Sequence, residues 1–264
     1  MTMTELTGPG VVYTSHHANQ PYPTPLMARL PRFVLPGVPQ HVIQRGNNRQ
    51  QILFKEEDYW FLWEKIGSAA EKFDCKIHAY VLMPNHFHLV LTPFSQDGIG
   101  KLMQYVGRYY VQYFNNCYDR TGTLWEGRYR ATLFDPAAFL VPISQYVESN
   151  PVRAGLVAAP ADYAWSSFAA NATGAEDRLI TPHAAFERQG RSPKTRQTAY
   201  LKGFGKPPDE ALLNRIRDAT NKAWVLGDPE FCTHIEKQAD RRASPRPRGG
   251  DRRSAAYREA TGRA

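Results

Sequence analysis

The residues best suited to chemistry stand in a short strand-like segment, residues 86–92. His86 and His88 are separated by a single residue, Phe87. Because side chains alternate between the two faces of a strand, both imidazoles project from one face and Phe87 from the other. Two parallel imidazoles at this spacing can bind one metal ion. For an arbitrary His-x-His pair, two half-exposed histidines without a ligand are the commoner outcome, so a metal site needs further support.

A second segment supplies a nucleophile and a candidate third ligand. Tyr146 and Asn150 are four residues apart in a segment of helical periodicity, which places them on one face of the predicted helix. The amide oxygen of Asn150 suits a hard divalent cation, and this ligand set fits Mg²⁺ or Mn²⁺ better than a closed zinc site. In the alternative interpretation, Tyr146 packs in the core, and Asn150 before Pro151 only ends the helix.

The periodicity of apolar residues predicts the elements that must hold these side chains. Strands are predicted at residues 40–45, 76–82, 86–92 and 128–134, and helices at residues 58–73, 99–114 and 136–150. The second and third strands form a hairpin. This order of elements predicts an α+β fold, an antiparallel sheet with helices packed on one face.

Composition divides the chain of 264 residues into four parts. The expected parts are a disordered leader at residues 1–26, a main domain at 27–170, a C-terminal extension at 171–238, and a basic disordered tail at 239–264. Short helices are predicted in the extension near residues 207–222 and 228–238.

Charge and cysteine content bound the class of protein. A formal charge of +8 and a pI of about 9.4 favour a polyanionic partner, although charge alone does not separate DNA from RNA or from an acidic membrane. The three cysteines contain no Cys-x-x-Cys pair, so neither a disulfide framework nor a cysteine zinc site is supported. With no apolar run near the ~18 residues of a membrane helix, and no secretory signal pattern at the start, a cytoplasmic protein without a membrane partner is expected.

Four ordered segments together resemble one family, the REP-associated tyrosine transposases. These are single-tyrosine transposases of the HUH class, within the IS200-like transposases. The segments are residues 41–49 (HVIQRGNNR), 82–88 (LMPNHFH), 124–130 (LWEGRYR) and 146–157 (YVESNPVRAGLV). Several motifs in matching order are more specific than any one of them, and the resemblance extends over residues 27–170.

The resemblance implies a role for each candidate residue. His86 and His88 correspond to the metal ligands of the HUH motif, Tyr146 to the nucleophile and Asn150 to the third ligand. The implied fold is a ferredoxin-like antiparallel sheet, which agrees with the predicted element order.

The resemblance also implies an activity. The enzyme would cleave and rejoin single-stranded DNA at palindromic, REP-like hairpins, through a 5′-phosphotyrosine intermediate and with Mg²⁺ or Mn²⁺ as cofactor. It would act as a monomer or a homodimer near the bacterial nucleoid. Tyrosine is a weak nucleophile until activated, and the sequence does not name the base. Glu148, two residues after Tyr146, is expected to point elsewhere on the helix.

Two clusters of polar and basic residues are candidates for contact with DNA. They are Arg45, Asn47, Asn48 and Arg49 after the first strand, and Arg128 and Arg130 on either side of Tyr129. Basic residues mixed with aromatic ones suit phosphate contacts and base stacking. An ordinary solvated loop is the alternative for each cluster.

Three competing interpretations remain open at this stage. A non-catalytic protein of ferredoxin-like fold could bind single-stranded nucleic acid without a metal and without a covalent adduct. A hydrolase could use His86 and His88 with water as the nucleophile, and the loss of activity without the Tyr146 hydroxyl would exclude it. Four other tyrosines compete with Tyr146, but none has Asn, Gln or a carboxylate four residues later: Tyr105, Tyr109, Tyr110 and Tyr113.

Overall fold

The computed structural model of the protein describes residues 33–204 and 209–244. The predicted leader, residues 1–26, lies outside the described residues, as does most of the predicted basic tail. In the part of the chain that is described, no helix combines the length and apolar character needed to cross a membrane.

Four strands form one antiparallel sheet, as predicted. They are β1 (Gln40–Arg45), β2 (Cys75–Met83), β3 (His86–Pro93) and β4 (Arg130–Leu133), in the order β2-β3-β1-β4. The order places β1 between β3 and β4, although two α-helices and two strands separate β1 from β4 in the sequence. The α+β class of the protein is therefore confirmed.

The helices of the main domain also follow the predicted segments. They are α1 (Glu56–Lys72), α2 (Gly98–Cys117), α3 (Pro136–Glu148) and the short α4 (Asn150–Arg153), with a 3₁₀ turn, η1 (Asn47–Arg49), after β1. The third predicted helix ends at Glu148 instead of residue 150. Pro151 cannot continue α3 because it lacks an N–H group, but it fits the first turn of a new helix, α4.

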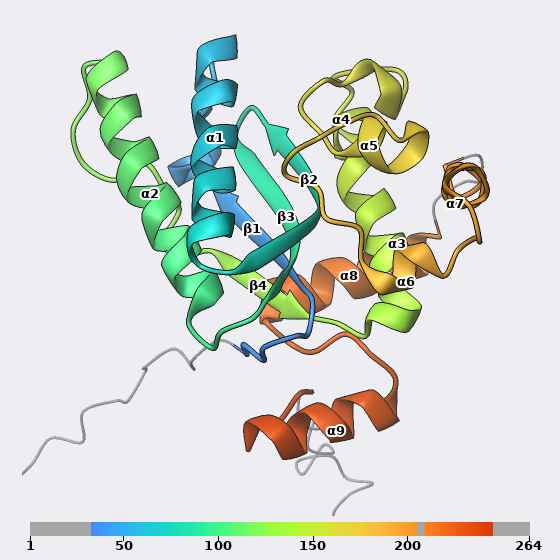
Figure 1. Cartoon of the computed structure of the whole chain (residues 1–264). Helices are drawn as coiled ribbons and strands as arrows, with labels where there is room; N and C mark the ends of the chain where they lie inside the picture. Colours follow the sequence, from blue (N-terminus) through green and yellow to red (C-terminus); the bar gives the residue numbers. More distant parts are fainter. Residues whose placement is uncertain (1–32, 205–208, 245–264) are drawn as a thin grey trace, which may run out of the picture. The chain divides into compact units, whose positions relative to one another are not determined.

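Helices cover both faces of the sheet. On one face α1 and α2 bury Val42, Leu82 and Phe87, as the prediction of helices on one face requires. On the opposite face α3 and a C-terminal helix, α8 (Glu210–Lys222), bury Val81 and Val90, a layer that the prediction left out (Figure 1). The physical reason is that β2 and β3 are nearly continuous apolar runs, which is the pattern of strands buried on both faces.

In the C-terminal part of the chain, α8 and the short helix α6 (Ala184–Glu187) pack against this second face. The other elements that follow α4 are η2 (Pro160–Asp162), α5 (Phe168–Thr173), α7 (Pro193–Leu201) and α9 (Pro229–Ala239). Helices α8 and α9 agree with the segments predicted near 207–222 and 228–238, of which residues 207 and 208 are not described. After α8, Leu226 N donates to Leu133 O (2.9 Å) and Asp135 N donates to Leu226 O (2.9 Å), which joins the extension to the end of β4.

A buried carboxylate, Asp58, fastens α1 to α2. Its oxygens accept hydrogen bonds from the backbone N–H groups of Phe54 (2.8 Å) and Lys55 (3.1 Å). They also accept from the hydroxyls of Tyr113 (2.9 Å) and Tyr118 (2.6 Å) on the neighbouring helix and its C-terminal end. One side chain therefore caps the start of α1 and anchors a second helix to it.

Asp58→Ala is expected to lower the free energy of unfolding by about 3 kcal/mol, because four donors lose a charged acceptor. Urea unfolding followed by circular dichroism would measure the change. Asp97→Ala is the matched control, since the Asp97 carboxylate is exposed where it pairs with Lys101 and should matter little. Equal losses in the two variants would contradict the role given to Asp58.

Candidate active site

His86 and His88 project together from β3 toward the face that α3 covers. Their ring centroids are 4.9 Å apart, whereas Phe87 lies in the core against α1 and α2. The predicted alternation of the three side chains is thus present. His88 is only 3% exposed, and His86 is half-buried.

Each of these histidines has its Nδ1 atom occupied. His86 Nδ1 lies 2.6 Å from Asn85 Oδ1, and His88 Nδ1 lies 2.8 Å from Nε2 of a third histidine, His41 on β1. His88 Nε2 is buried and has no hydrogen-bond partner among the described residues. The Nε2 atoms are therefore the ones left to bind a ligand from outside the chain.

Burial keeps all three histidines neutral at pH 7. Desolvation lowers the pKa of His86 to about 4, and the charge of Arg45 lowers it further. Desolvation lowers the pKa of His41 to about 3 and holds the pKa of His88 well below its usual value. A neutral imidazole has a lone pair that a metal ion could use, and in His86 and His88 this lone pair can lie on Nε2.

Tyr146 on α3 lies directly against this histidine cluster. Its ring meets the ring of His41 edge-on at a centroid distance of 5.9 Å and the ring of His88 at 6.3 Å. The same tyrosine lines a pocket of about 500 Å³ together with Arg153 and Leu212. The structure therefore brings the predicted nucleophile beside a predicted ligand and beside a space that can admit a substrate.

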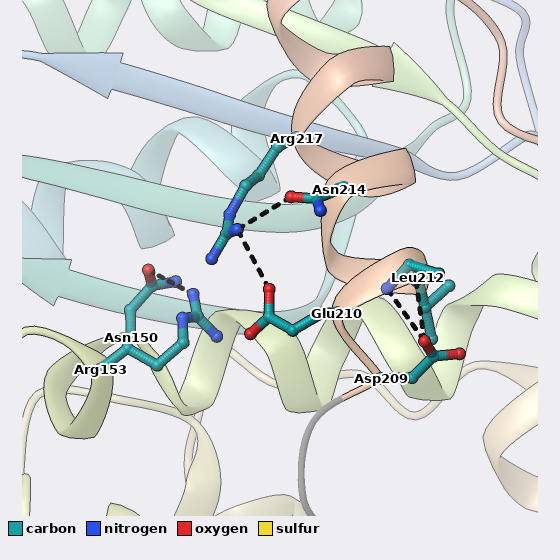
Figure 2. Close-up of polar contacts among 8 residues, drawn as sticks. Asn150, Arg153, Asp209, Glu210, Leu212, Asn214 and Arg217 are labelled. Atoms are coloured by element: carbon teal, nitrogen blue, oxygen red, sulfur yellow. Dashed lines mark hydrogen bonds and ion pairs between the residues drawn. The ribbon is translucent and has the colours of Figure 1, made fainter.

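Asn150 and Arg153 are hydrogen-bonded to each other beside Tyr146. Arg153 Nη2 donates to Asn150 Oδ1 (2.8 Å), and Asn150 Nδ2 donates to the backbone oxygen of Val147 (3.0 Å). Figure 2 shows this pair opposite the start of α8, where Glu210 and Arg217 form an ion pair of 3.7 Å. The amide oxygen of Asn150 thus already accepts one hydrogen bond, from Arg153, and has a second lone pair.

Arg153 also fixes Tyr146, a role that the sequence analysis missed. Its guanidinium lies 4.1 Å from the centre of the Tyr146 ring, and Nη1 donates to Tyr146 O (2.9 Å). The available signal was spacing, because Arg153 follows Asn150 by three residues and Tyr146 by seven and so shares their helix face. His41 was missed as well. Alternation along β1 places His41 on the face opposite to that of Val42, but only the strand order shows that β1 lies beside β3, which carries His88.

Four of the six predicted DNA-binding residues line one pocket, which we call the arginine pocket. It has a volume of about 400 Å³, and its lining residues are Ile43, Arg45, Arg49, Glu126, Arg128, Arg130 and Asn221. Asn47 and Asn48 are not among them. They belong to η1, where Asn48 has a left-handed backbone conformation (φ 50°).

Sheet register places the arginine pocket next to the histidines. His86 pairs with Arg45, and His88 pairs with Ile43, which in turn pairs with Arg130. Cross-strand partners point to the same face and have Cβ atoms about 5 Å apart. Arg45, Arg130 and the histidine cluster therefore lie side by side on the face of the sheet that carries α3 and α8.

His86 and His88 could bind a divalent cation, but the described residues contain no site made only of histidine, cysteine and carboxylate ligands. Over residues 33–204 and 209–244, no group of three or more such side chains is placed to hold a metal ion. The unpartnered Nε2 of His88 and the adjacent His86 would supply two nitrogen ligands, and the remaining positions would be open to oxygen ligands, as is typical of catalytic metal ions.

The competing tyrosines lie away from these histidines. Tyr110 is fully buried and donates to Ile52 O (2.5 Å), and Tyr113 donates to Asp58. All four competing tyrosines belong to α2, on the opposite face of the sheet from His86 and His88. Among the five tyrosines considered, Tyr146 alone adjoins the histidine cluster.

Comparison with known proteins relates this part of the chain to transposases. Residues 36–150 match a protein family described as Transposase IS200 like. Among solved structures, the chain is similar to a REP-associated tyrosine transposase bound to a REP hairpin, with 20% identity, a TM-score of 0.47, and coverage of 60% of this chain and 96% of that chain. It is also similar to a putative transposase from Deinococcus radiodurans, with 22% identity, a TM-score of 0.34, and coverage of 46% and 96%. A search of curated proteins gives no match.

The family match covers all four strands, the helices α1 to α3 and the candidate site from His41 to Asn150. Residues 36–150, less than half of the chain, are thus similar to the IS200-like transposases.

Proposed function

We propose that this protein is an enzyme that cleaves and rejoins single-stranded DNA through Tyr146, with a divalent metal ion, Mg²⁺ or Mn²⁺, held by His86 and His88. The observation that carries the proposal is the position of Tyr146. Its ring packs against His88 and His41 and at the same time lines an open pocket. A tyrosine that served only as core packing would not need the neutral imidazoles of His41 and His88 beside it.

The proposed reaction is a transesterification at phosphorus. Tyr146 Oη forms a bond to the phosphorus atom as the bond to the 3′ oxygen breaks. The phenolic proton leaves, the 3′ oxygen gains a proton, and the products are a 5′-phosphotyrosine and a free 3′-hydroxyl. Rejoining is the reverse attack by a 3′-hydroxyl, which needs no ATP. A bound cation would polarise the phosphate and stabilise the charge that develops on its oxygens.

Asn150 and Arg153 have linked parts in this proposal. Arg153 holds both Tyr146 and Asn150, and a guanidinium pairs well with phosphate oxygens. In this proposal Arg153 would contact the scissile phosphate, and Asn150 Oδ1, which has a second lone pair, would be the third ligand of a bound cation.

The arginine pocket is the proposed contact for the DNA backbone. Arg45 lies on β1 beside His86, and Arg130 lies on β4, on the other side of β1. Single-stranded DNA bound across these arginines would therefore lead toward the histidines and Tyr146. Asn47 and Asn48, in η1 beside the pocket, are proposed to extend this contact. Palindromic hairpins are the proposed substrate class, by similarity to the relative that binds a REP hairpin. The protein would act on them as a monomer or a homodimer in the cytoplasm, in association with the nucleoid.

A second candidate function rests on the arginine pocket alone. A protein that only binds single-stranded nucleic acid needs the basic surface but neither the histidine cluster nor Tyr146. The two candidates differ in one product, the covalent adduct.

We expect the adduct to map to Tyr146 by mass spectrometry. The protein would be incubated with single-stranded hairpin DNA from repeats beside its gene and with Mn²⁺, and then digested with nuclease and trypsin. Cleavage after Arg130 and Arg153 releases residues 131–153, in which Tyr146 is the only tyrosine. The expected result is a nucleotide mass on this peptide that is absent when EDTA replaces Mn²⁺.

Two other results would change the assignment. DNA binding without an adduct on any hairpin tested would favour the binding protein. A nucleotide on a peptide from α2 would retain the reaction and reject Tyr146 as its nucleophile.

A further inference from the structure

A chain of buried hydrogen bonds connects α8 to His88. Thr220 Oγ1 lies 2.8 Å from Ile216 O, His41 Nδ1 lies 3.2 Å from Thr220 Oγ1, and His41 Nε2 lies 2.8 Å from His88 Nδ1. Thr220, His41 and His88 are 2%, 1% and 3% exposed. Because bulk water does not reach these atoms, each depends on its neighbour in the chain for a hydrogen bond.

The chemistry of the first acceptor fixes the direction of every proton. A carbonyl oxygen only accepts, so the single hydroxyl proton of Thr220 goes to Ile216 O. Thr220 Oγ1 must then accept from His41, which places the His41 proton on Nδ1. A neutral imidazole carries one proton, so His41 Nε2 accepts from His88 Nδ1. His88 is left with its lone pair on Nε2, the buried atom that has no hydrogen bond within the described residues.

We infer that Thr220 and His41 are positioning residues that hold His88 in the tautomer able to bind a cation through Nε2. The rings of His41 and His88 are also nearly parallel, with an interplanar angle of 10° and centroids 5.1 Å apart, so the same contact fixes the ring plane. Metal-binding histidines commonly donate their second N–H to a fixed acceptor, which sets tautomer and orientation. Here the acceptor is a second histidine, itself oriented by a threonine. The inference rests on the proposed function in taking His88 as a metal ligand.

The end of α8 is held firmly enough to serve this purpose. Beyond Thr220 the helix closes at Ala223, whose φ is 55°, and Leu226 then pairs with Leu133 at the end of β4. The next residue on α8, Asn221, accepts a hydrogen bond from Arg130 of the arginine pocket. One turn of α8 thus contacts both the arginine pocket and the hydrogen-bonded chain of Thr220, His41 and His88, which we call the histidine relay. Because Thr220 and Asn221 lie outside residues 36–150, the extension contributes to the site itself.

Two substitutions of Thr220 separate the hydroxyl from the packing. Thr220→Val keeps the shape and removes the acceptor for His41, whereas Thr220→Ser keeps the hydroxyl. Thr132→Val is the matched control, because Thr132 pairs with His41 across the sheet on the same face, and its Oγ1 makes no hydrogen bond in the described structure. All variants would be prepared as the full chain, and their folding would be checked by thermal unfolding.

The first measurement is the tautomer of His88 by ¹⁵N NMR of the metal-free protein. In the wild type, Thr220→Ser and Thr132→Val we expect the proton on Nδ1, and in Thr220→Val a substantial fraction on Nε2. The second is Mn²⁺ affinity by titration calorimetry. We expect a loss of about 10- to 100-fold in Thr220→Val and little change in the other two variants. His41→Phe should lower the Mn²⁺ affinity as well. The double variant Thr220→Val/His41→Phe should lose no more affinity than His41→Phe alone, because both substitutions act through one chain of hydrogen bonds.

The outcomes separate this inference from the proposed function. A His88 tautomer and a Mn²⁺ affinity in Thr220→Val equal to those of the wild type would overturn the relay. Equal losses in Thr220→Val, Thr220→Ser and Thr132→Val would also overturn it, because they would show an effect of packing. A wild-type protein that binds no Mn²⁺ would reject the proposed metal site, whereas the NMR measurement, made without metal, would still decide the relay.

Discussion

Tyr146→Phe is expected to abolish the covalent protein–DNA adduct and to lower strand cleavage by about 10³-fold or more. The substitution removes the one oxygen that can form the bond to phosphorus. It keeps the ring that packs against His41, His88 and the Arg153 guanidinium, so the site should retain its shape. A denaturing gel with labelled hairpin DNA and Mn²⁺ would show the adduct and the cleaved strand together.

The control for this experiment is Tyr109→Phe. Tyr109 is 40% exposed on α2, across the sheet from the histidines, and its loss should leave the adduct unchanged. Fluorescence anisotropy should show that Tyr146→Phe still binds the hairpin. An adduct that survives in Tyr146→Phe would mean that another side chain is the nucleophile. Cleavage that survives without any adduct would favour a hydrolase that uses water.

The second large expected effect is on the stability of the protein, and it comes from Glu148 on α3. The side chain is fully buried, and its oxygens accept hydrogen bonds from Ser167 (2.6 Å), Asn171 (2.8 Å) and Tyr200 (2.7 Å). Burial raises the pKa of Glu148 to about 7, although the three donors act in the opposite direction. As expected from the sequence, Glu148 points away from Tyr146, and it joins α3 to α5 and α7.

The shift makes wild-type stability fall as pH rises. The folded carboxyl has the higher pKa, so the folded protein binds more protons than the unfolded chain between pH 4.5 and 7. The stabilisation from the neutral carboxyl is complete below about pH 4.5 and is lost as pH rises through about 7. Glu148→Gln cannot ionise and loses nothing over this range. From pH 5 to pH 8 the wild type should lose about 2 to 3 kcal/mol relative to Glu148→Gln.

Urea unfolding at the two pH values would measure this difference. Comparison with the variant removes the contributions of the buried histidines, which both proteins share. Glu64→Gln is the control, because Glu64 forms only an exposed ion pair with Arg178. Parallel pH dependence in wild type and Glu148→Gln would show that Glu148 is ionised in the folded protein even at pH 5.

Local patterns were sufficient to predict most elements and two features of the site. The strand at residues 40–45 and the three long helices follow from hydrophobic periodicity, which is a property of neighbouring residues. The shared face of His86 and His88 follows from alternation along one strand. The placement of Tyr146 and Asn150 follows from the spacing of one helix, although Pro151 divides that helix into α3 and α4. The chemical roles of these residues remain predictions.

The assembly of the site depended on contacts that are remote in the sequence. His41 and His88 are 47 residues apart, and they meet only because β1 inserts between β3 and β4. The arginine pocket forms for the same reason, since its residues come from β1, η1 and the segment that leads into β4. No local pattern specifies strand order, because it is decided by which pairings bury the most apolar surface on both faces of the sheet.

The hydrogen bond between Thr220 and His41 shows most clearly which features the sequence alone determined and which depended on the tertiary structure. The sequence by itself determined that a histidine pair, a tyrosine and basic clusters would stand on particular strands and helices, because backbone geometry repeats over a few residues. Thr220, 179 residues from His41, has no such local signature. Only the packing of α8 on the second face of the sheet brings its hydroxyl to the histidine relay, because a buried hydrogen bond needs a partner in space, wherever that partner lies in the chain.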